Sequence, residues 1–264
     1  MIKLIITGAR GKMGAAIIKC ALEDKYFEIV GLVETKSHPD VGKPSGIMAG
    51  TTDKPLFIEN DLENVIEKCD VVIDFTEAKA SIEHFRITKK RGKAHVIGTT
   101  GLSDDTLAEI NHTKDAKVVI SPNMSVGMNI LFDVCNKVAG TLKEGYDVEI
   151  LEMHHRWKKD APSGSALRLK DAIEAAKPDQ KWIEVFGREG ITGERKAHEI
   201  GIMSLRGGDV VGEHTVFFTG MGERLEFTHR AFSRDNFARG ALLAARWLVT
   251  QPTGIYSMKD VLGL

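Results

Sequence analysis

The sequence predicts an α/β protein that combines an N-terminal doubly wound parallel sheet with a second α+β domain, whose sheet is open and mixed or antiparallel. Up to residue 121, short apolar runs alternate with amphipathic helical stretches, as in a parallel sheet covered by helices. After residue 180, four strand-like runs follow one another without a helix between them. A final helical stretch returns the chain to its first part. We therefore expect one domain from residues 1–125 and 236–264 and another from residues 126–235.

Composition excludes several classes of partner. The chain has 264 residues, of which 42% are hydrophobic and 28% charged, as in ordinary globular proteins. Its formal net charge of -1 gives no broad attraction to nucleic acid or to an anionic membrane. No apolar run approaches the ~20 residues that span a bilayer, and charges follow the first apolar run too soon for a signal peptide. Cys20, Cys69 and Cys135 are widely spaced, so we expect buried, unreactive thiols and a cytoplasmic protein.

A glycine-rich turn follows the first strand, residues 3–7. It reads Gly8-Ala-Arg-Gly-Lys-Met-Gly14 and leads into a helix, and the next strand, residues 28–34, ends on Glu34. Glycines let the backbone approach a pyrophosphate, the helix start favours its charge, and the acid accepts ribose hydroxyls. The spacing Gly-x-x-Gly-x-x-Gly departs from the usual pattern. The order strand, turn, helix, strand, acid nevertheless predicts a Rossmann-type dinucleotide site.

The rest of the first domain alternates strands with helices. We expect an irregular loop over residues 36–56, where Gly and Pro recur (Pro39, Gly42, Pro44, Gly46, Gly50, Pro55), and a short helix over 61–68. Strands are predicted over 70–75, 94–98 and 117–121, with helices over 76–90 and from Ser103 or Asp104 onward. Parallel strands end at one edge of their sheet. The strand ends Phe75–Thr76, Gly98–Thr100 and Ser121–Met124 are therefore expected at the cofactor edge.

The second domain is predicted to begin with a helix over residues 126–139 and a strand over 148–153. The four later runs, residues 183–186, 199–205, 213–219 and 223–229, suggest a meander. We expect a largely antiparallel sheet that also takes in the 148–153 strand. A helix over 234–249 closes the chain, and the histidines of these strands lack a metal-ligand spacing, so no metal is expected.

The segment between the 148–153 strand and the next helix gathers chemical groups. It reads Glu152-Met-His-His-Arg-Trp-Lys-Lys-Asp-Ala-Pro-Ser-Gly-Ser165. Lys158 and Arg156 supply positive charge, either His154 or His155 can transfer a proton near neutral pH, and the helix start at residues 163–165 favours a carboxylate. These features suit capture of a small dianion followed by proton transfer. The nearby Glu149 and Glu152 can either orient a histidine or form salt bridges on the strand face.

Several segments together resemble one family over essentially the whole chain, the 4-hydroxy-tetrahydrodipicolinate reductases, also called dihydrodipicolinate reductases. The most specific are Glu152-Met-His-His155 with Lys158, and Asp160-Ala-Pro-Ser-Gly-Ser165. The other similar segments are the glycine turn, Asp74-Phe-Thr76, Gly98-Thr-Thr-Gly101, Ser121-Pro-Asn-Met-Ser125, Arg206-Gly-Gly-Asp-Val-Val-Gly-Glu-His214 and Glu223-Arg-Leu-Glu-Phe-Thr-His-Arg230.

The resemblance implies NAD(P)H-dependent reduction of 4-hydroxy-tetrahydrodipicolinate, a small dicarboxylate, to tetrahydrodipicolinate in lysine and diaminopimelate biosynthesis. It makes His154 the general acid/base and Lys158 a second proton donor or charge stabiliser. His155 would contact the substrate, and Gly164 and Ser165 would hold a carboxylate. It also implies a homotetramer built through the second domain's sheet. The implied cofactor residues are Gly8, Ala9, Arg10, Gly11, Lys12, Met13, Glu34, Gly98, Thr99, Thr100, Ser121, Pro122, Asn123 and Met124.

Two positions depart from the family's pattern. Lys12 stands where an arginine often precedes Met-Gly, and Thr35 stands where some members carry an arginine for the NADPH 2′-phosphate. Lys36 can replace that arginine, whereas Glu34 repels the phosphate. The sequence therefore slightly favours NADH and leaves either NADH or NADPH as the cofactor.

Two other functions fit part of the pattern. An amino-acid or semialdehyde dehydrogenase shares the two-domain plan, but it gives no reason for the His-His-x-x-Lys and Pro-Ser-Gly-Ser segments. A non-catalytic NAD(H) sensor would bind the cofactor and tolerate loss of His154 and Lys158. Turnover of the implied substrate discriminates between these alternatives and a reductase.

Overall fold

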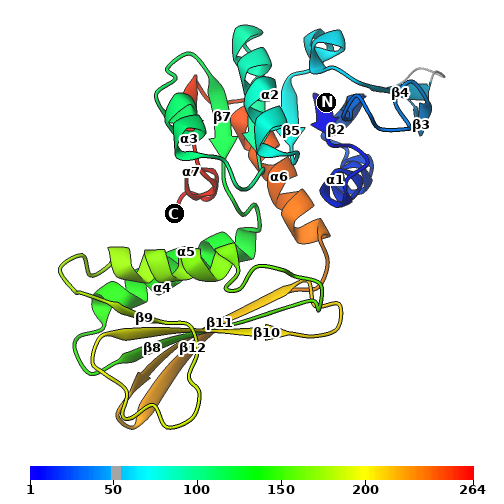
Figure 1. Cartoon of the computed structure of the whole chain (residues 1–264). Helices are drawn as coiled ribbons and strands as arrows, with labels where there is room; N and C mark the ends of the chain where they lie inside the picture. Colours follow the sequence, from blue (N-terminus) through cyan, green and yellow to red (C-terminus); the bar gives the residue numbers. More distant parts are fainter. Residues whose placement is uncertain (49–54) are drawn as a thin grey trace. The chain divides into compact units, whose positions relative to one another are not determined.

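A computed structural model of the chain describes residues 1–48 and 55–264 (Figure 1). The chain forms two compact units, one made of Met1–Val126 with Arg234–Leu264 and the other of Gly127–Ser233. Gly50, in the expected irregular loop, lies outside the described residues. No helix in the described part of the chain is both long enough and apolar enough to cross a membrane.

The first unit is built on an eight-stranded, mostly parallel sheet, as predicted. Its strands lie in the order β13-β7-β6-β5-β1-β2-β4-β3, and the pairing of β3 with β4 is antiparallel. The strands are β1 (Ile2–Thr7), β2 (Phe27–Val33), β3 (Pro44–Met48), β4 (Pro55–Glu59), β5 (Val71–Asp74), β6 (Ala94–Ile97), β7 (Lys117–Ile120) and β13 (Gly254–Tyr256). Because β1, β2, β5, β6 and β7 are parallel, the segments that follow them reach the same edge.

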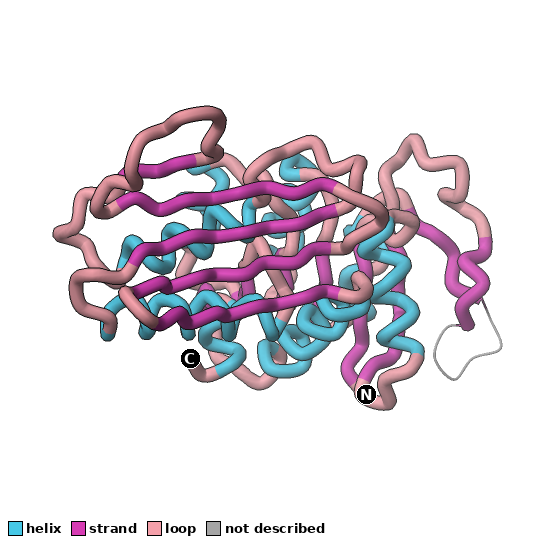
Figure 2. The backbone as a smooth tube through the Cα atoms, turned by 90° about the horizontal axis from the view of Figure 1, so that it is seen from below, coloured by secondary structure: helices cyan, strands magenta, loops and turns pink. Residues whose placement is uncertain are grey.

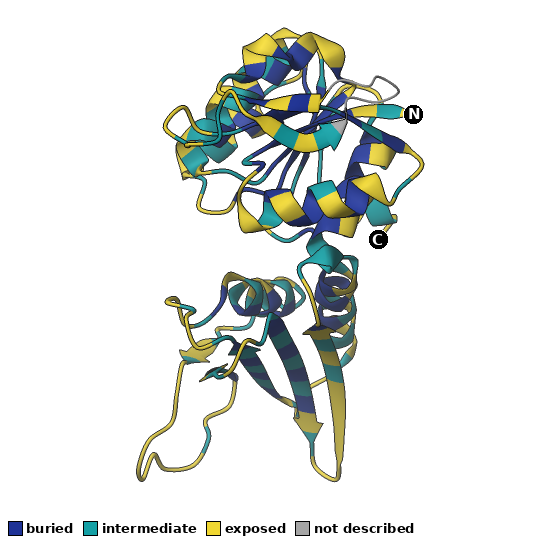
Figure 3. Ribbon diagram, turned by 90° about the vertical axis from the view of Figure 1, so that its right-hand side faces the viewer, coloured by how far each residue is buried: buried dark blue, intermediate teal, exposed yellow. Residues whose placement is uncertain are grey.

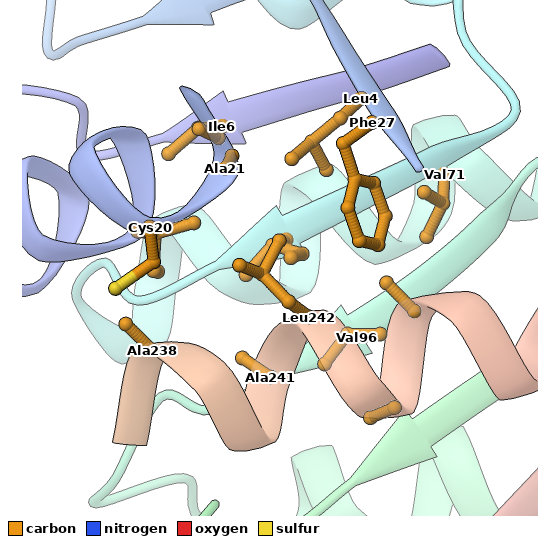
Figure 4. Packing of buried hydrophobic residues seen from close by; sticks show 14 of the residues in the cluster. Leu4, Ile6, Cys20, Ala21, Phe27, Val71, Val96, Ala238, Ala241 and Leu242 are labelled. Atoms are coloured by element: carbon orange, nitrogen blue, oxygen red, sulfur yellow. The ribbon is translucent and has the colours of Figure 1, made fainter. Parts of the chain in front are cut away.

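Helices cover both faces of this sheet. Helices α1 (Lys12–Leu22), α6 (Asp235–Leu248) and α7 (Met258–Leu262) share one apolar core with the strands, part of which Figure 4 shows. On the other face lie α2 (Ala78–Lys90), α3 (Asp104–Asn111) and two short 3-10 turns, Leu62–Asn64 and Ile66–Lys68. Ser103 caps α3 by accepting a hydrogen bond from the Thr106 backbone. The sheet is thus doubly wound.

Three expectations for this unit were wrong in detail. The irregular loop expected over 36–56 contains β3 and the first residues of β4, because Leu56 packs into the core and a strand tolerates proline at its first residue. The short helix over 61–68 is two 3-10 turns that meet at Val65. The pattern also missed β13 and α7, which are too short to show a periodicity.

The second unit contains a five-stranded sheet in the order β12-β11-β8-β10-β9 (Figure 2). Its strands are β8 (Asp147–His154), β9 (Ile183–Val185), β10 (Glu199–Arg206), β11 (Gly212–Gly220) and β12 (Glu223–Ala231). Buried and less buried residues alternate along β8 and β11 (Figure 3). The buried set packs against α4 (Val126–Thr141) and α5 (Gly164–Ala175), and both helices lie on the same side of the sheet.

The open mixed sheet expected for this domain is confirmed, but the meander predicted for its four later runs was wrong. β11 pairs antiparallel with β8 and β12, whereas β10 pairs parallel with both β8 and β9. The reason is a crossover, since α5 returns the chain from the end of β8 before β9 begins. The sheet is therefore mixed, and β8 lies at its centre.

The expectation of buried, unreactive thiols is confirmed. Cys20, Cys69 and Cys135 are buried and none forms a disulfide. Burial raises the pKa of the Cys69 and Cys135 thiols to about 12, so both stay protonated at neutral pH.

Candidate active site

A buried carboxylate, Glu152, organises the end of β8. Its side chain has no exposed surface. Arg206, on the neighbouring strand β10, donates two hydrogen bonds to it, at 2.9 Å to Oε2 and 2.8 Å to Oε1. The Ser163 backbone N–H donates to Oε1 at 3.1 Å. A buried charge needs this degree of compensation, so Glu152, Arg206 and the start of α5 form one rigid group.

His154 is held by the same carboxylate. Its Nδ1 lies 2.5 Å from Glu152 Oε2, and the residue is 9% exposed. Residues two apart on a strand share a face, which is why Glu152 and His154 meet. A carboxylate accepts only, so Nδ1 carries the proton and Nε2 is the nitrogen that can exchange one. The geometry therefore shows that Glu152 orients a histidine, which is one of the two roles that the sequence left open for it.

Glu152 stays ionised in this setting. Burial opposes its charge, but the hydrogen bonds from His154 and Arg206 outweigh burial and lower the pKa to about 2. Glu149, by contrast, pairs with Arg188 at 2.9 Å and with Arg195 at 3.2 Å, away from His154. Glu152 thus orients His154 and also forms a salt bridge with Arg206, whereas Glu149 forms salt bridges alone.

A second histidine, His214 of β11, lies against His154. The ring centroids are 5.2 Å apart in an edge-to-face arrangement, and the His214 Nε2 is 3.0 Å from the Ser163 hydroxyl. Burial lowers the pKa of His214 to about 3, so its ring is neutral at physiological pH. From the sequence, His214 was weighed only as a metal ligand. Its one signal as a residue of this site was the Gly-Glu-His214 segment of the family resemblance.

The structure separates His155 from His154. Their side chains leave opposite faces of the chain at the end of β8. His155 is half-buried and its ring lies 5.8 Å from that of the exposed Trp157. Only His154 has the buried carboxylate partner, so only His154 is oriented by the fold for proton transfer.

Lys158 lies at the same end of the sheet as a half-buried cation. Its ammonium group contacts both carboxylate oxygens of Asp160, at 2.9 and 2.8 Å. The hydrogen bond from Lys158 lowers the pKa of Asp160 below its ordinary value. Asp160 is itself exposed, so an anionic ligand can compete with it for the ammonium group.

The start of α5 brings the Pro-Ser-Gly-Ser segment to this group. Ser163 is the N-cap, and its hydroxyl accepts from the Ala166 N–H at 3.2 Å. The backbone N–H groups of Gly164 and Ser165 lie in the first turn of α5. Together with the helix dipole they suit a carboxylate.

The glycine turn of the first unit has the shape that close approach requires. Gly8 has a positive φ of 65°, and Gly11 is the N-cap of α1. A Cβ on Gly14 would lie 2.1 Å from the Gly8 carbonyl oxygen, so only glycine allows α1 to begin this close to the turn. Ala9 is buried, whereas Lys12 is exposed and Met13 half-buried.

Glu34 faces the glycine turn. Its Oε2 accepts a hydrogen bond from the Arg10 backbone N–H at 2.9 Å, and its Oε1 accepts from Thr35. The Arg10 guanidinium lies 2.9 Å from Asp40. Glu34 thus lies beside the glycine turn just after β2, and Thr35 and Lys36 next to it are exposed.

The other predicted cofactor segments follow β6 and β7. A Cβ on Gly98 would overlap the Phe75 ring at 2.2 Å, so the strand ends pack tightly. Thr99 is buried and Thr100 exposed. After β7, the Ser121 hydroxyl donates to the Asn123 carbonyl, and Pro122 between these two residues is exposed. Helix α6 passes so close to the Met124 carbonyl that only a glycine, Gly240, fits there.

Comparison with protein families covers both units. The model for the N-terminus of dihydrodipicolinate reductase matches residues 2–124, and the model for its C-terminus matches residues 127–262. The chain belongs to the dihydrodipicolinate reductase family. Two similar relatives are named 4-hydroxy-tetrahydrodipicolinate reductase. The one from Syntrophus aciditrophicus is 48% identical over all of this chain and 99% of its own length. The one from Geobacter sp. (strain M21) is 47% identical over the whole of both.

Solved structures agree with dihydrodipicolinate reductase membership. The dipicolinate-bound dihydrodipicolinate reductase from Paenisporosarcina sp. TG-14 is 26% identical with a TM-score of 0.80, covering 98% of this chain and 99% of that one. An amine dehydrogenase from Mycobacterium smegmatis is 14% identical with a TM-score of 0.61, covering 97% and 95%. The second likeness shows the fold alone, which explains why a dehydrogenase of similar plan fitted part of the sequence.

Proposed function

We propose that His154 and Lys158 carry out the proton transfer of the reaction that family membership assigns to this chain. That reaction is NAD(P)H-dependent reduction of 4-hydroxy-tetrahydrodipicolinate in lysine and diaminopimelate biosynthesis. The observation that supports the proposal is the buried, ionised Glu152, which holds Nδ1 of His154 at 2.5 Å. A general acid must be oriented toward the atom that it protonates, and here the fold orients one of the two adjacent histidines.

The nicotinamide, when bound, supplies the hydride. The arriving electron pair must then be quenched by a proton, and His154 Nε2 is the nitrogen free to deliver it. Glu152 stabilises the imidazolium form that precedes the transfer, and Arg206 keeps the carboxylate fixed. Lys158 can act as a second donor or stabilise negative charge on the substrate. Holding these groups in place lowers the barrier because reorganisation is avoided.

A dicarboxylate needs two anion sites. We assign one to the N–H groups of Gly164 and Ser165 at the start of α5 and the other to the neighbourhood of Lys158. His155, beside the exposed Trp157, is proposed to contact the substrate ring. These assignments give Lys158 a charge role that no neighbouring lysine shares.

Replacement of Lys158 by alanine is therefore expected to lower turnover by at least about 10²-fold while the protein stays folded. Its adjacent neighbour Lys159, which is exposed, provides the matched control: Lys159→Ala removes the same charge one residue away. Steady-state kinetics with both variants, each checked by thermal unfolding, decide the matter. Near-normal turnover of folded Lys158→Ala excludes Lys158 from the proposed role.

The cofactor site is proposed to be the edge formed by the glycine turn, Glu34 and the segments after β6 and β7. Glu34 disfavours a 2′-phosphate, and the Arg10 guanidinium is already paired with Asp40. Lys36 is exposed and is the nearest cation in sequence that can receive a phosphate. We expect use of both cofactors, with NADH modestly preferred.

The function is tested by following nicotinamide absorbance with purified protein and the fresh condensation product of pyruvate and aspartate semialdehyde. NADH and NADPH are used in separate reactions. Oxidation that depends on this product establishes the reductase activity, and the ratio of the two rates measures the cofactor preference. Binding of NADH without turnover would instead support the sensor alternative, and turnover only with amino acids would support the dehydrogenase alternative.

The second unit is also proposed to assemble with further copies of itself, as the homotetramer implied by the resemblance. The helices cover one face of its sheet, and the opposite face presents apolar side chains between charged ones. The apolar ones are Leu151, Met153, Met203, Leu205 and Phe217. Leu205 is 46% exposed, and a second copy would bury such a surface.

Light scattering during size-exclusion chromatography tests the assembly. The wild type is expected to elute as a tetramer, and Leu205→Glu as a smaller species. Leu243→Glu, at a 40% exposed leucine of α6, is the matched control and should leave the tetramer intact. A monomeric wild type would rule the tetramer out.

A further inference from the structure

A second buried carboxylate lies far along the chain from His154, at the end of β5. Asp74 has no exposed surface. Its Oδ1 accepts from the Thr76 backbone N–H at 2.9 Å, from the Thr76 hydroxyl at 2.6 Å and from the Thr99 hydroxyl at 3.2 Å. One oxygen atom therefore ties the turn that follows β5 to the loop that follows β6.

The other oxygen of Asp74 faces two histidines. His84 of α2 places Nδ1 2.8 Å from Oδ2, and His95 of β6 places Nε2 3.6 Å from it. Burial opposes the charge of Asp74, but the hydrogen bond from His84 and the nearby His95 ring outweigh burial and lower the pKa of the carboxyl below its ordinary value. Burial also lowers the pKa of His95, which favours its neutral form. Asp74 is thus ionised, with His84 as its close donor.

The groups tied by Asp74 adjoin the glycine turn. A Cβ on Gly8 would lie 3.1 Å from the Thr76 methyl carbon and 3.2 Å from the Phe75 carbonyl oxygen. Strands β6, β5 and β1 are neighbours in that order, so the segments after them form consecutive parts of one edge. This is the edge at which open parallel sheets bind dinucleotides. The Asp74 carboxylate joins the segments after β5 and β6, and the Thr76 turn in turn adjoins the glycine turn.

We propose that Asp74 is a positioning residue for dinucleotide binding, which holds the Thr76 turn and the Thr99 loop in the arrangement that receives the cofactor. His84 supports this role by donating to the carboxylate from α2. Asp74 is completely buried, so it acts through Thr76 and Thr99. The inference rests on the proposed dinucleotide site of the first unit. It extends that site to Asp74 and His84, which the glycine pattern does not include.

Asp74→Asn tests the proposal directly. The amide keeps the shape of the side chain but offers one acceptor oxygen in place of two, and its NH₂ group meets the donors that now face the carboxylate. If the NH₂ group takes the place of Oδ1, the Thr76 turn and the Thr99 loop lose their common acceptor. If it takes the place of Oδ2, the hydrogen bond from His84 is lost and the side chain is no longer held from α2. We expect the Kd for NADH, measured by fluorescence without substrate, to rise by about tenfold or more. The KM for NADH should rise in parallel, with kcat at saturating NADH close to that of the wild type.

Asp70→Asn is the matched control for this variant. Asp70 precedes β5 at the opposite edge of the sheet, where its carboxylate also accepts from a backbone N–H, that of Lys3, at 2.8 Å. Removing that charge should leave the Kd for NADH unchanged.

A pair of variants at His84 gives a test that does not depend on the folding of Asp74→Asn. The His84 side chain is only 15% exposed, so His84→Leu fits its site but removes the donor. His84→Asn keeps an N–H close to the position of Nδ1. His84→Leu should weaken NADH binding severalfold, and His84→Asn should restore most of the affinity. A purely structural role would change the melting temperatures of the variants without this difference in NADH affinity.

An unchanged Kd for NADH in His84→Leu and in folded Asp74→Asn, with full reductase turnover, would overturn the proposal and leave the reductase function intact. A wild type that binds NADH but reduces no substrate would remove the reductase function, while the effects of both variants on NADH binding would still support the role of Asp74.

Discussion

Replacing His154 by alanine is expected to lower turnover by at least about 10²-fold, with NADH binding and fold retained. The reason is the arrangement around the imidazole. Glu152 accepts a hydrogen bond from Nδ1, the neutral His214 ring lies edge-to-face with the His154 ring, and Nε2 is left as the nitrogen that exchanges a proton. Without the imidazole, no other histidine of the second unit has a buried carboxylate partner among the described contacts. Steady-state kinetics at saturating NADH measure the effect.

Two comparisons make the His154 result specific. His112, an exposed histidine at the end of α3, serves as the control, and His112→Ala should keep full activity. His155→Ala should raise the KM of the substrate more than it lowers kcat, because His155 is proposed to bind and not to transfer a proton. Equal losses of kcat in the His154 and His155 variants would contradict the assignment of the proton to His154.

Glu152→Gln is expected to cost about as much in turnover as His154→Ala, although Glu152 need not touch the substrate. The glutamine has one acceptor oxygen and one NH₂ group, so the NH₂ group must stand in the place of Oε1 or of Oε2 and meet donors there. In the place of Oε2 it meets His154, whose ring then turns or moves its proton to Nε2. In the place of Oε1 it meets the Arg206 guanidinium and the Ser163 N–H, which then no longer fix the side chain that orients His154. The guanidinium of Arg206 would also lose one of its two carboxylate acceptors.

The pH dependence of stability provides an independent readout for Glu152. Its pKa is lowered in the folded protein to about 2 from an ordinary value of 4.5, so its charge stabilises the folded state. This contribution is complete above about pH 4.5 and is lost as the pH falls towards about 2. The difference in unfolding free energy between wild type and Glu152→Gln should therefore shrink across that window.

Glu149→Gln is the control for both measurements. Glu149 lies on the same strand but pairs with Arg188 and Arg195, so its replacement should leave turnover unchanged. If Glu149→Gln lowered turnover as strongly, or if Glu152→Gln were fully active, the orienting role of Glu152 would be wrong.

Local patterns in the sequence were enough to predict most of the longer strands and helices and the residue types of the site. Apolar runs and glycine punctuation located the long strands and helices, because burial of alternating or helical faces leaves a periodicity that can be read locally. The sequence also supplied His154, Lys158 and the start of α5, since one short segment carries all three. The family followed from these same segments.

The partners of those groups depend on how distant parts of the chain come together. Arg206 lies 54 residues from Glu152, and His214 lies 51 residues from Ser163, so no local pattern relates them. The parallel pairing of β8 with β10 brings Arg206 to Glu152, whereas an antiparallel meander would have placed other residues there. The choice of Glu152 over Glu149, and the joining of Asp74 to Thr99 and His84, likewise depend on which strands are neighbours. Chain topology fixes such contacts, and topology is set by packing across the whole sheet and not by the periodicity of any one strand.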